Sequence, residues 1–125
     1  MKTRTRLLSL ALLTAAATLV VAQGGQKVSP ERAKLDKLGK VYREAKAKST
    51  KAPKDAKLKT AYIQATVSFG TATMNSPILA PKEKYPSALR LYREALKLDP
   101  KNKEALANKK TIEDIYRSLG REIPK

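Results

Sequence analysis

The sequence predicts an all-α domain of about four helices arranged as antiparallel pairs, and three observations support that fold class. Apolar residues recur every three or four positions in four segments, which is the spacing of one helix face. Proline and glycine interrupt this pattern between and after the segments. Cysteine is absent, so the domain has to be stabilised by packing without disulfides, and helices with local contacts suit that restriction.

The first helix is predicted to begin at Ser29 and Pro30 and to run to about Lys48. Serine is a good N-cap, and proline suits the first helical position because its missing N–H needs no partner there. Residues 49–53 break the pattern. The helix should bury one face, formed by Leu35, Leu38, Tyr42 and Ala45.

A second helix is predicted from about Asp55, and it carries two apolar stripes rather than one. No charged residue lies between Lys59 and Lys82. A helix that is apolar most of the way round is buried between neighbours, so this helix should be the centre of the domain. The first stripe holds Leu58, Ala61, Tyr62, Ala65, Phe69 and Ala72, and the second holds Ile63, Val67, Gly70 and Met74.

Residues 75–86 are predicted to form a long loop, because they contain Pro77, Pro81 and Pro86. Proline lacks the backbone donor and clashes with the preceding helical turn. Two apolar residues of this loop, Ile78 and Leu79, are expected to plug the end of the core.

The third helix should therefore begin at Pro86 and end before Pro100. The fourth should run from about Asn102 to Leu119, with Gly120 as its stop signal. Inward positions predicted for the third helix are Ala88, Leu91, Tyr92, Ala95 and Leu98, and for the fourth Ala105, Leu106, Ile112, Ile115, Tyr116 and Leu119.

Residues 1–22 predict export through a cleaved signal peptide. Three basic residues precede an uncharged segment, residues 7–22, which ends in the small side chain of Ala22. A retained membrane anchor is the alternative, but this segment reaches only about 24 Å as a helix and the hydrocarbon core is about 30 Å thick. We therefore expect a flexible lead-in over residues 23–28 and the helical domain over residues 29–125, in the periplasm, the cell envelope or outside the cell.

The residue types argue against an enzyme. Histidine and cysteine are absent, which removes the commonest general base and the usual zinc ligands. The sequence has no Gly-rich phosphate loop, nucleophile elbow or dinucleotide motif. Glu113 and Asp114 are adjacent, but neighbours on a helix point about 100° apart, so a solvated face explains this pair better than a shared site. We expect no catalysis, no cofactor, no metal and no small-molecule substrate.

The net charge of +16 at pH 7 predicts attraction to polyanions. Basic residues crowd the segment from Lys27 to Lys59, and most of them are lysine. They are either ordinary solvated faces or a face that binds nucleic acid or an acidic envelope polymer. Base stacking would favour nucleic acid, yet only Tyr85 lies off the apolar stripes and is free to stack. The predicted polyanion face consists of Lys34, Lys37, Lys40, Lys48, Lys51 and Lys54.

Residues 85–100 carry small and aromatic side chains at a characteristic spacing. Ala88, Tyr92, Ala95 and Pro100 follow one another at intervals of four, three and five residues. Small residues let two helices approach closely, the aromatic fills the gap between pairs, and the proline turns the chain into the next helix. This segment resembles the second helix of a tetratricopeptide repeat, and a looser resemblance covers residues 55–120. It implies a short right-handed superhelix of stacked helix pairs.

The resemblance also implies a binding role. Tetratricopeptide domains bind peptides or protein segments in the groove lined by the first helices of successive pairs, and the predicted fourth helix best matches a first helix. Its candidate partner site is Asn108, with Lys101 and Thr111 as neighbours, and a solvated capping face is the alternative. The sequence thus predicts an exported, non-enzymatic adaptor for a protein or peptide, acidic partners included, with a basic polyanion-binding protein as the rival. Self-association that covers an open end of so short a stack is a further expectation.

Overall fold

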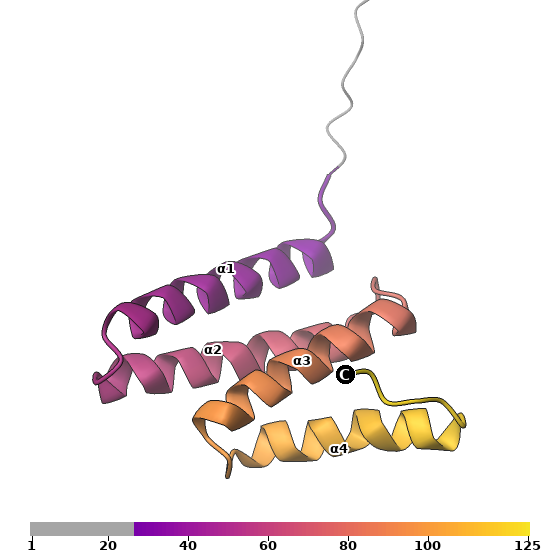
Figure 1. Ribbon diagram of the computed structural model, residues 1–125. Coiled ribbons are helices and arrows are strands. Elements are labelled where there is room, and N and C mark those ends of the chain that lie inside the picture. The colour runs from indigo at the N-terminus through magenta and orange to yellow at the C-terminus, as the bar shows by residue number, and fades with distance from the viewer. Residues whose placement is uncertain (1–26) are drawn as a thin grey trace, which may run out of the picture.

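The computed structural model describes residues 27–125, and these residues form four helices and no strand. The helices are α1 (Pro30–Lys51), α2 (Ala56–Met74), α3 (Pro81–Leu98) and α4 (Lys103–Ser118). Successive helices run antiparallel, and α2 and α3 lie between α1 and α4 in a small stack (Figure 1). The all-α prediction with four helices is confirmed. The expected signal peptide, residues 1–22, and all but the last two residues of the lead-in lie outside the described residues.

Polar side chains at the predicted positions start three of the helices. Ser29, Asp55 and Asn102 each accept hydrogen bonds from backbone N–H groups in the first turn that follows. Such a cap contributes about 1 kcal/mol, because those N–H groups have no partner within the helix. Gly120 has a φ of 61°, the left-handed conformation that commonly ends a helix, and it follows α4 as predicted. Where a local side chain determines a helix end, the predicted end is therefore correct to within a few residues.

The long loop predicted over residues 75–86 is wrong, because α3 begins at Pro81 and continues through Pro86. Pro81 occupies the first helical position, where proline is tolerated. The N–H that Pro86 lacks would have bonded to the carbonyl of Lys82, an exposed residue in the first turn that water can reach. The connection therefore shrinks to residues 75–80. Of its two expected core plugs, Leu79 is half-buried and Ile78 is exposed.

The prediction that α2 is the centre is confirmed, since α2 packs against both α1 and α3 and also touches α4. Its buried positions differ in detail from the predicted stripes. Ala61 was expected to face inward and is exposed, whereas Thr66 is fully buried. The Thr66 hydroxyl donates to the carbonyl of Tyr62 at 2.7 Å, so its burial leaves no polar atom without a partner.

The main core forms where α2, α3 and α4 meet, and we call it the Tyr92 core. Tyr92 has no exposed surface, and Gly70 of α2 allows it to pack so closely. A Cβ at Gly70 would lie 3.1 Å from Cε1 of Tyr92, closer than ordinary packing allows. The Tyr92 core consists of Val67, Ala88, Leu89, Tyr92, Ala95, Ala105 and Ile112.

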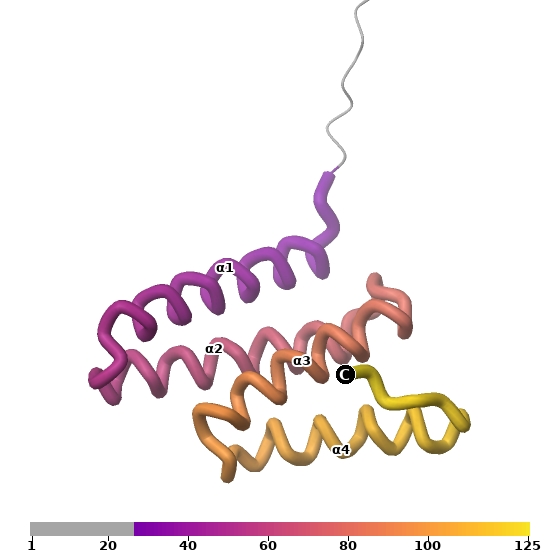
Figure 2. Tube along the Cα trace, viewed as in Figure 1, coloured from indigo at the N-terminus to yellow at the C-terminus, as the bar shows by residue number. Residues whose placement is uncertain are grey.

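Part of the apolar stripe predicted for α4 is wrong. Leu106 and Leu119 were expected to face inward, but they are 46% and 61% exposed. Only one side of this last helix has neighbours, so its apolar face is narrower than the pattern suggests. After α4 the chain folds back toward α3, as the path of the Cα trace shows (Figure 2). There Ile123 packs against the Tyr92 core, and Arg93 donates to the carbonyl of Pro124 at 2.7 Å. Within residues 27–125 no helix has both the length and the hydrophobicity to cross a membrane.

Candidate functional site

A groove runs between α1 and α3 above α2, and we call it the α1/α3 groove. Both α1 and α3 pack on α2, so α2 provides the floor and side chains of α1 and α3 provide the walls. Its first hollow has a volume of about 350 Å³. The apolar part of that hollow is formed by Leu35, Phe69, Leu79 and Leu91, and its charged rim by Arg32, Asp36, Arg43 and Arg90.

A second hollow of about 510 Å³ continues the α1/α3 groove toward the carboxyl ends of α1 and α3. Arg90 lines both hollows, so the two share a wall. Tyr62 and Leu98 contribute apolar surface here. The other charged residues of this part are Lys46, Arg93, Glu94, Lys97 and Lys125.

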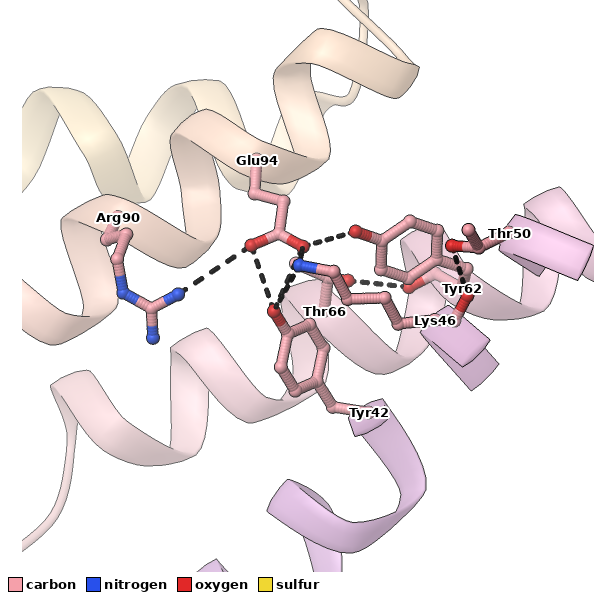
Figure 3. A network of polar contacts seen from close by, with 7 residues as sticks. All are labelled: Tyr42, Lys46, Thr50, Tyr62, Thr66, Arg90 and Glu94. Atoms are coloured by element: carbon pink, nitrogen blue, oxygen red, sulfur yellow. Dashed lines mark hydrogen bonds and ion pairs between the residues drawn. The ribbon is translucent and has the colours of Figure 1, made fainter. Parts of the chain in front are cut away.

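On the wall of the second hollow, side chains of three helices meet at the carboxylate of Glu94 (Figure 3). Tyr42 of α1 donates to both carboxylate oxygens at 2.9 Å, and Lys46, one turn further on, donates at 2.8 Å. Tyr62 of α2 donates to the same group, and Nη1 of Arg90 lies 3.7 Å from it. We call Tyr42, Lys46, Tyr62 and Glu94 the Glu94 bridge. It ties α1 to α3 through polar side chains at the edge of a buried apolar cluster formed by Tyr42, Tyr62, Ala65 and Leu91.

The Glu94 bridge changes the ionisation of its members. Burial alone would raise the pKa of the Glu94 carboxyl, but hydrogen bonds from Lys46, Tyr62 and Tyr42 outweigh it and hold the pKa below its ordinary value. The hydrogen bond to Glu94 raises the pKa of Lys46. Burial, followed by the Glu94 hydrogen bond, raises the pKa of Tyr62 to about 12. At neutral pH the bridge is therefore a carboxylate that is paired with the Lys46 ammonium group and accepts hydrogen bonds from two tyrosine hydroxyls.

Gly39 shapes the α1 wall of the first hollow. A Cβ built on Gly39 would lie 3.2 Å from Nη1 of Arg43 and 3.2 Å from Cζ of Phe69. The Arg43 guanidinium therefore lies over the glycine and beside the tip of the Phe69 ring. This placement puts a cation directly at the edge of the apolar floor.

Arginine and lysine are distributed differently over the surface. Arg32, Arg43, Arg90 and Arg93 line the α1/α3 groove, and of the arginines in the described chain only Arg117 and Arg121 lie elsewhere. By contrast, the predicted polyanion face is entirely lysine. All six of its members are exposed, and on α1 they cover an arc of about 120° on the side away from Gly39 and Tyr42. That face is a solvated lysine surface, separate from the groove.

The predicted partner site on α4 lies on a different side of the molecule, and its members have separate contacts. Asn108 is half-buried and donates to the Tyr92 hydroxyl at 3.0 Å and to Thr71 at 3.3 Å. The Thr111 hydroxyl donates to the carbonyl of Ala107, and Lys101 lies exposed in the turn before α4. Asn108 thus helps to hold the buried tyrosine in place.

The structure also shows what surrounds Tyr85 and the adjacent acids Glu113 and Asp114, which the sequence analysis considered as functional residues. Tyr85, predicted to be free for stacking, is half-buried against the Tyr92 core, so that prediction is wrong. Glu113 and Asp114 pair with different lysines of α4, Lys109 and Lys110, one turn before them. Arg117 lies 2.8 Å from Asp114 and 3.7 Å from Glu113, so the two adjacent carboxylates belong to one network of ion pairs along α4.

Sequence reasoning missed the α1/α3 groove, because its residues come from three helices and a loop. One local signal was available: Glu94 is an acid on α3 between the small and aromatic positions of the Ala88 to Pro100 pattern, and its neighbour Arg93 also faces the groove. Which residues of α1 would meet it depends on how the helices pack, and periodicity alone does not specify that. Comparison of the chain with protein-family models, with curated proteins and with solved structures gives no match.

Proposed function

We propose that this protein is an exported, non-catalytic adaptor that binds a segment of another protein in the α1/α3 groove. The observation that carries the proposal is the groove itself, an apolar floor with a charged rim that remains open between two helices. Concave sites with apolar lining and a few placed polar groups are where proteins bind ligands. The rim of the first hollow carries three arginines and one acid, Asp36, and this excess of positive charge suits the binding of an oppositely charged partner.

Two features of the sequence support the same function. The basic start and uncharged stretch of residues 1–22 favour export. The resemblance of residues 85–100 to a tetratricopeptide helix favours a stack of helix pairs that presents a groove to a peptide or a protein segment. The resemblance matches α3 to a second helix and α4 to a first, so by itself it favours the α4 face around Asn108. The apolar floor and the cationic rim favour the α1/α3 groove as the place for that partner.

A second candidate function is binding of a polyanion through the lysine face of α1. The favouring observation is that Lys34, Lys37, Lys40, Lys48 and Lys51 are all exposed on one side of a single helix. Such a surface attracts nucleic acid or acidic polymer through release of counterions, and the attraction falls steeply as salt rises.

Cross-linking the protein in a cell-envelope fraction at low and at moderate salt separates the two functions. Recovery of the same protein partner at both salt concentrations, lost on Gly39→Leu, supports the adaptor function, because the new side chain would fill the first hollow. Loss of all partners at moderate salt, with no effect of Gly39→Leu, contradicts it and supports polyanion binding. Lys37→Gln serves as the matched control on the outer face of α1, and it should leave the adaptor partner attached.

A further inference from the structure

We infer that the occupant of the α1/α3 groove is an acidic peptide segment in which carboxylates alternate with apolar side chains. This inference rests on the proposed function and specifies the chemistry of its partner. The first hollow would take an apolar side chain on its floor, while carboxylates of the same segment would pair with Arg43, Arg90 and Arg32 on the rim.

The positions of the arginines support carboxylate recognition. The guanidinium group presents a planar fork of donors that matches a carboxylate, whereas lysine is a more strongly hydrated point charge. In the first hollow the basic residues are all arginine, whereas lysines share the second hollow with Arg90 and Arg93 and cover the outer face of α1. The rim of the first hollow therefore carries the cation whose shape matches a carboxylate.

The groove also carries positive charge that the protein does not neutralise. Within residues 27–125, Arg32 and Arg43 take part in no ion pair. Arg90 lies 3.7 Å from Glu94, but that carboxylate is already paired with Lys46 at 2.8 Å. Asp36 is the acid on the rim of the first hollow, against three arginines. An incoming carboxylate would therefore meet an excess of cationic groups.

The floor argues for a peptide rather than for a nucleic acid. The half-buried Phe69 lies at the base of the first hollow beside the Arg43 guanidinium, and the largely buried Leu35 and Leu91 complete its apolar lining. A single-stranded nucleic acid would need successive aromatic faces on which its bases could stack. Phe69 is the only aromatic residue that lines this hollow. An apolar side chain next to a carboxylate matches both the floor and the rim.

Binding of four labelled probes to the purified protein, followed by fluorescence anisotropy, tests the inference. The first probe is a short peptide in which Glu alternates with Leu. The second carries Ser in place of Leu, the third carries Gln in place of Glu, and the fourth is a single-stranded oligonucleotide. We expect the Glu–Leu peptide to bind most tightly and to retain most of its affinity between about 50 mM and about 200 mM salt, because its apolar contacts are not screened.

Two substitutions that should change the affinity for the Glu–Leu peptide in opposite directions make the test more specific. Arg43→Gln should weaken the Glu–Leu peptide by roughly tenfold, which is the usual effect of losing a charge-assisted hydrogen bond. Asp36→Asn should strengthen binding of the same peptide several-fold, because it removes from the rim a negative charge that repels the carboxylates of the peptide. Lys37→Gln and Glu44→Gln make the same charge changes on the outer face of α1, and each should leave the affinity within about twofold.

Three outcomes would overturn the inference. If the Ser-containing peptide or the oligonucleotide binds as tightly as the Glu–Leu peptide, or if Lys37→Gln weakens binding as much as Arg43→Gln, diffuse surface charge is responsible. If the Gln–Leu peptide binds as tightly and Gly39→Leu abolishes that binding, the groove takes peptides without selecting acids, and only the adaptor function stands. If no peptide binds to protein whose circular dichroism is helical, and Gly39→Leu does not change partner capture, the adaptor function fails as well.

Discussion

The two faces of α3 differ in how they are held, although Tyr92 and Glu94 are only two residues apart. On the Tyr92 side, α3 is buried and closely packed against α2 and α4, and the Tyr92 hydroxyl is hydrogen-bonded to Thr71 and Asn108. The Glu94 side also has buried apolar contacts around Tyr42, Tyr62 and Leu91, but polar side chains from α1 and α2 span it and the two hollows open on it. The same helix is thus a stabilising element on one side and the wall of an open groove on the other. The comparison predicts that stability and binding can be altered separately.

The largest expected effect is on the Tyr92 core. Tyr92→Ala should lower the free energy of unfolding by about 3 to 5 kcal/mol, because it empties a fully buried site that cannot collapse. Phe69→Ala, at the half-buried floor of the groove, should lower it by roughly half as much, since part of that ring is already in contact with solvent. Urea unfolding measures both. An equal effect of the two changes would contradict the proposed difference between the faces.

The next effect contrasts two glycines. Gly70→Ala should destabilise the protein by about 1 to 2 kcal/mol, because the new Cβ meets the immobile ring of Tyr92 at 3.1 Å and the better helix propensity of alanine offsets only part of that strain. Gly39→Ala should change stability by less than about 0.5 kcal/mol. Its Cβ meets the end of the flexible Arg43 side chain and the Phe69 ring tip, which can move toward the open hollow. Thermal unfolding of the two variants, measured side by side, checks this order.

A smaller effect concerns the pH dependence of the Glu94 bridge. The pKa of Glu94 is lowered by folding, so the folded protein binds fewer protons at this group than the unfolded chain does. Its contribution should be complete above the ordinary pKa of 4.5 and should be lost as the pH falls through the lower folded value. Glu94→Gln should lower the free energy of unfolding by about 1 kcal/mol at pH 7 and should flatten its decline in acid. Urea unfolding from pH 7 to pH 3 tests this, and an unchanged acid decline would contradict it.

The smallest effect is expected at the outer side of α4. Leu106→Gln should change the free energy of unfolding by less than about 0.5 kcal/mol, because this side chain is 46% exposed. The matched change Ile112→Gln, on the buried side of the same helix, should prevent stable folding by placing a polar group in the Tyr92 core. If Leu106→Gln instead lowers stability in a concentration-dependent way, then α4 forms part of an interface between copies.

Much of the fold could be predicted from local residues, and the candidate site could not. The capping side chains at Ser29, Asp55 and Asn102, together with Gly120, act on groups within one turn of themselves, so their positions in the sequence are enough. The prediction around Pro86 was wrong because a helix tolerates an internal proline when water can reach the carbonyl group that loses its N–H donor. Here that carbonyl belongs to the exposed Lys82. The groove residues Arg43, Phe69 and Arg90 each fit an ordinary helix surface, and nothing in their local pattern indicates that they meet.

The sequence by itself determined the all-α class, the order of four helices and the central place of α2, because periodicity and capping act over distances of a few residues. Tertiary packing alone decided which charges share a site. The orientation of α1 on α2 brings Tyr42 and Lys46 to Glu94 and places Arg43 over Gly39, and the close approach at Gly70 buries Tyr92 on the opposite face. Arg43 and Gly39 lie one turn apart on α1, and the tertiary part of that contact is their approach to Phe69 of α2. The other contacts join residues that are far apart along the chain, and their geometry depends on the volumes of the side chains between the helices.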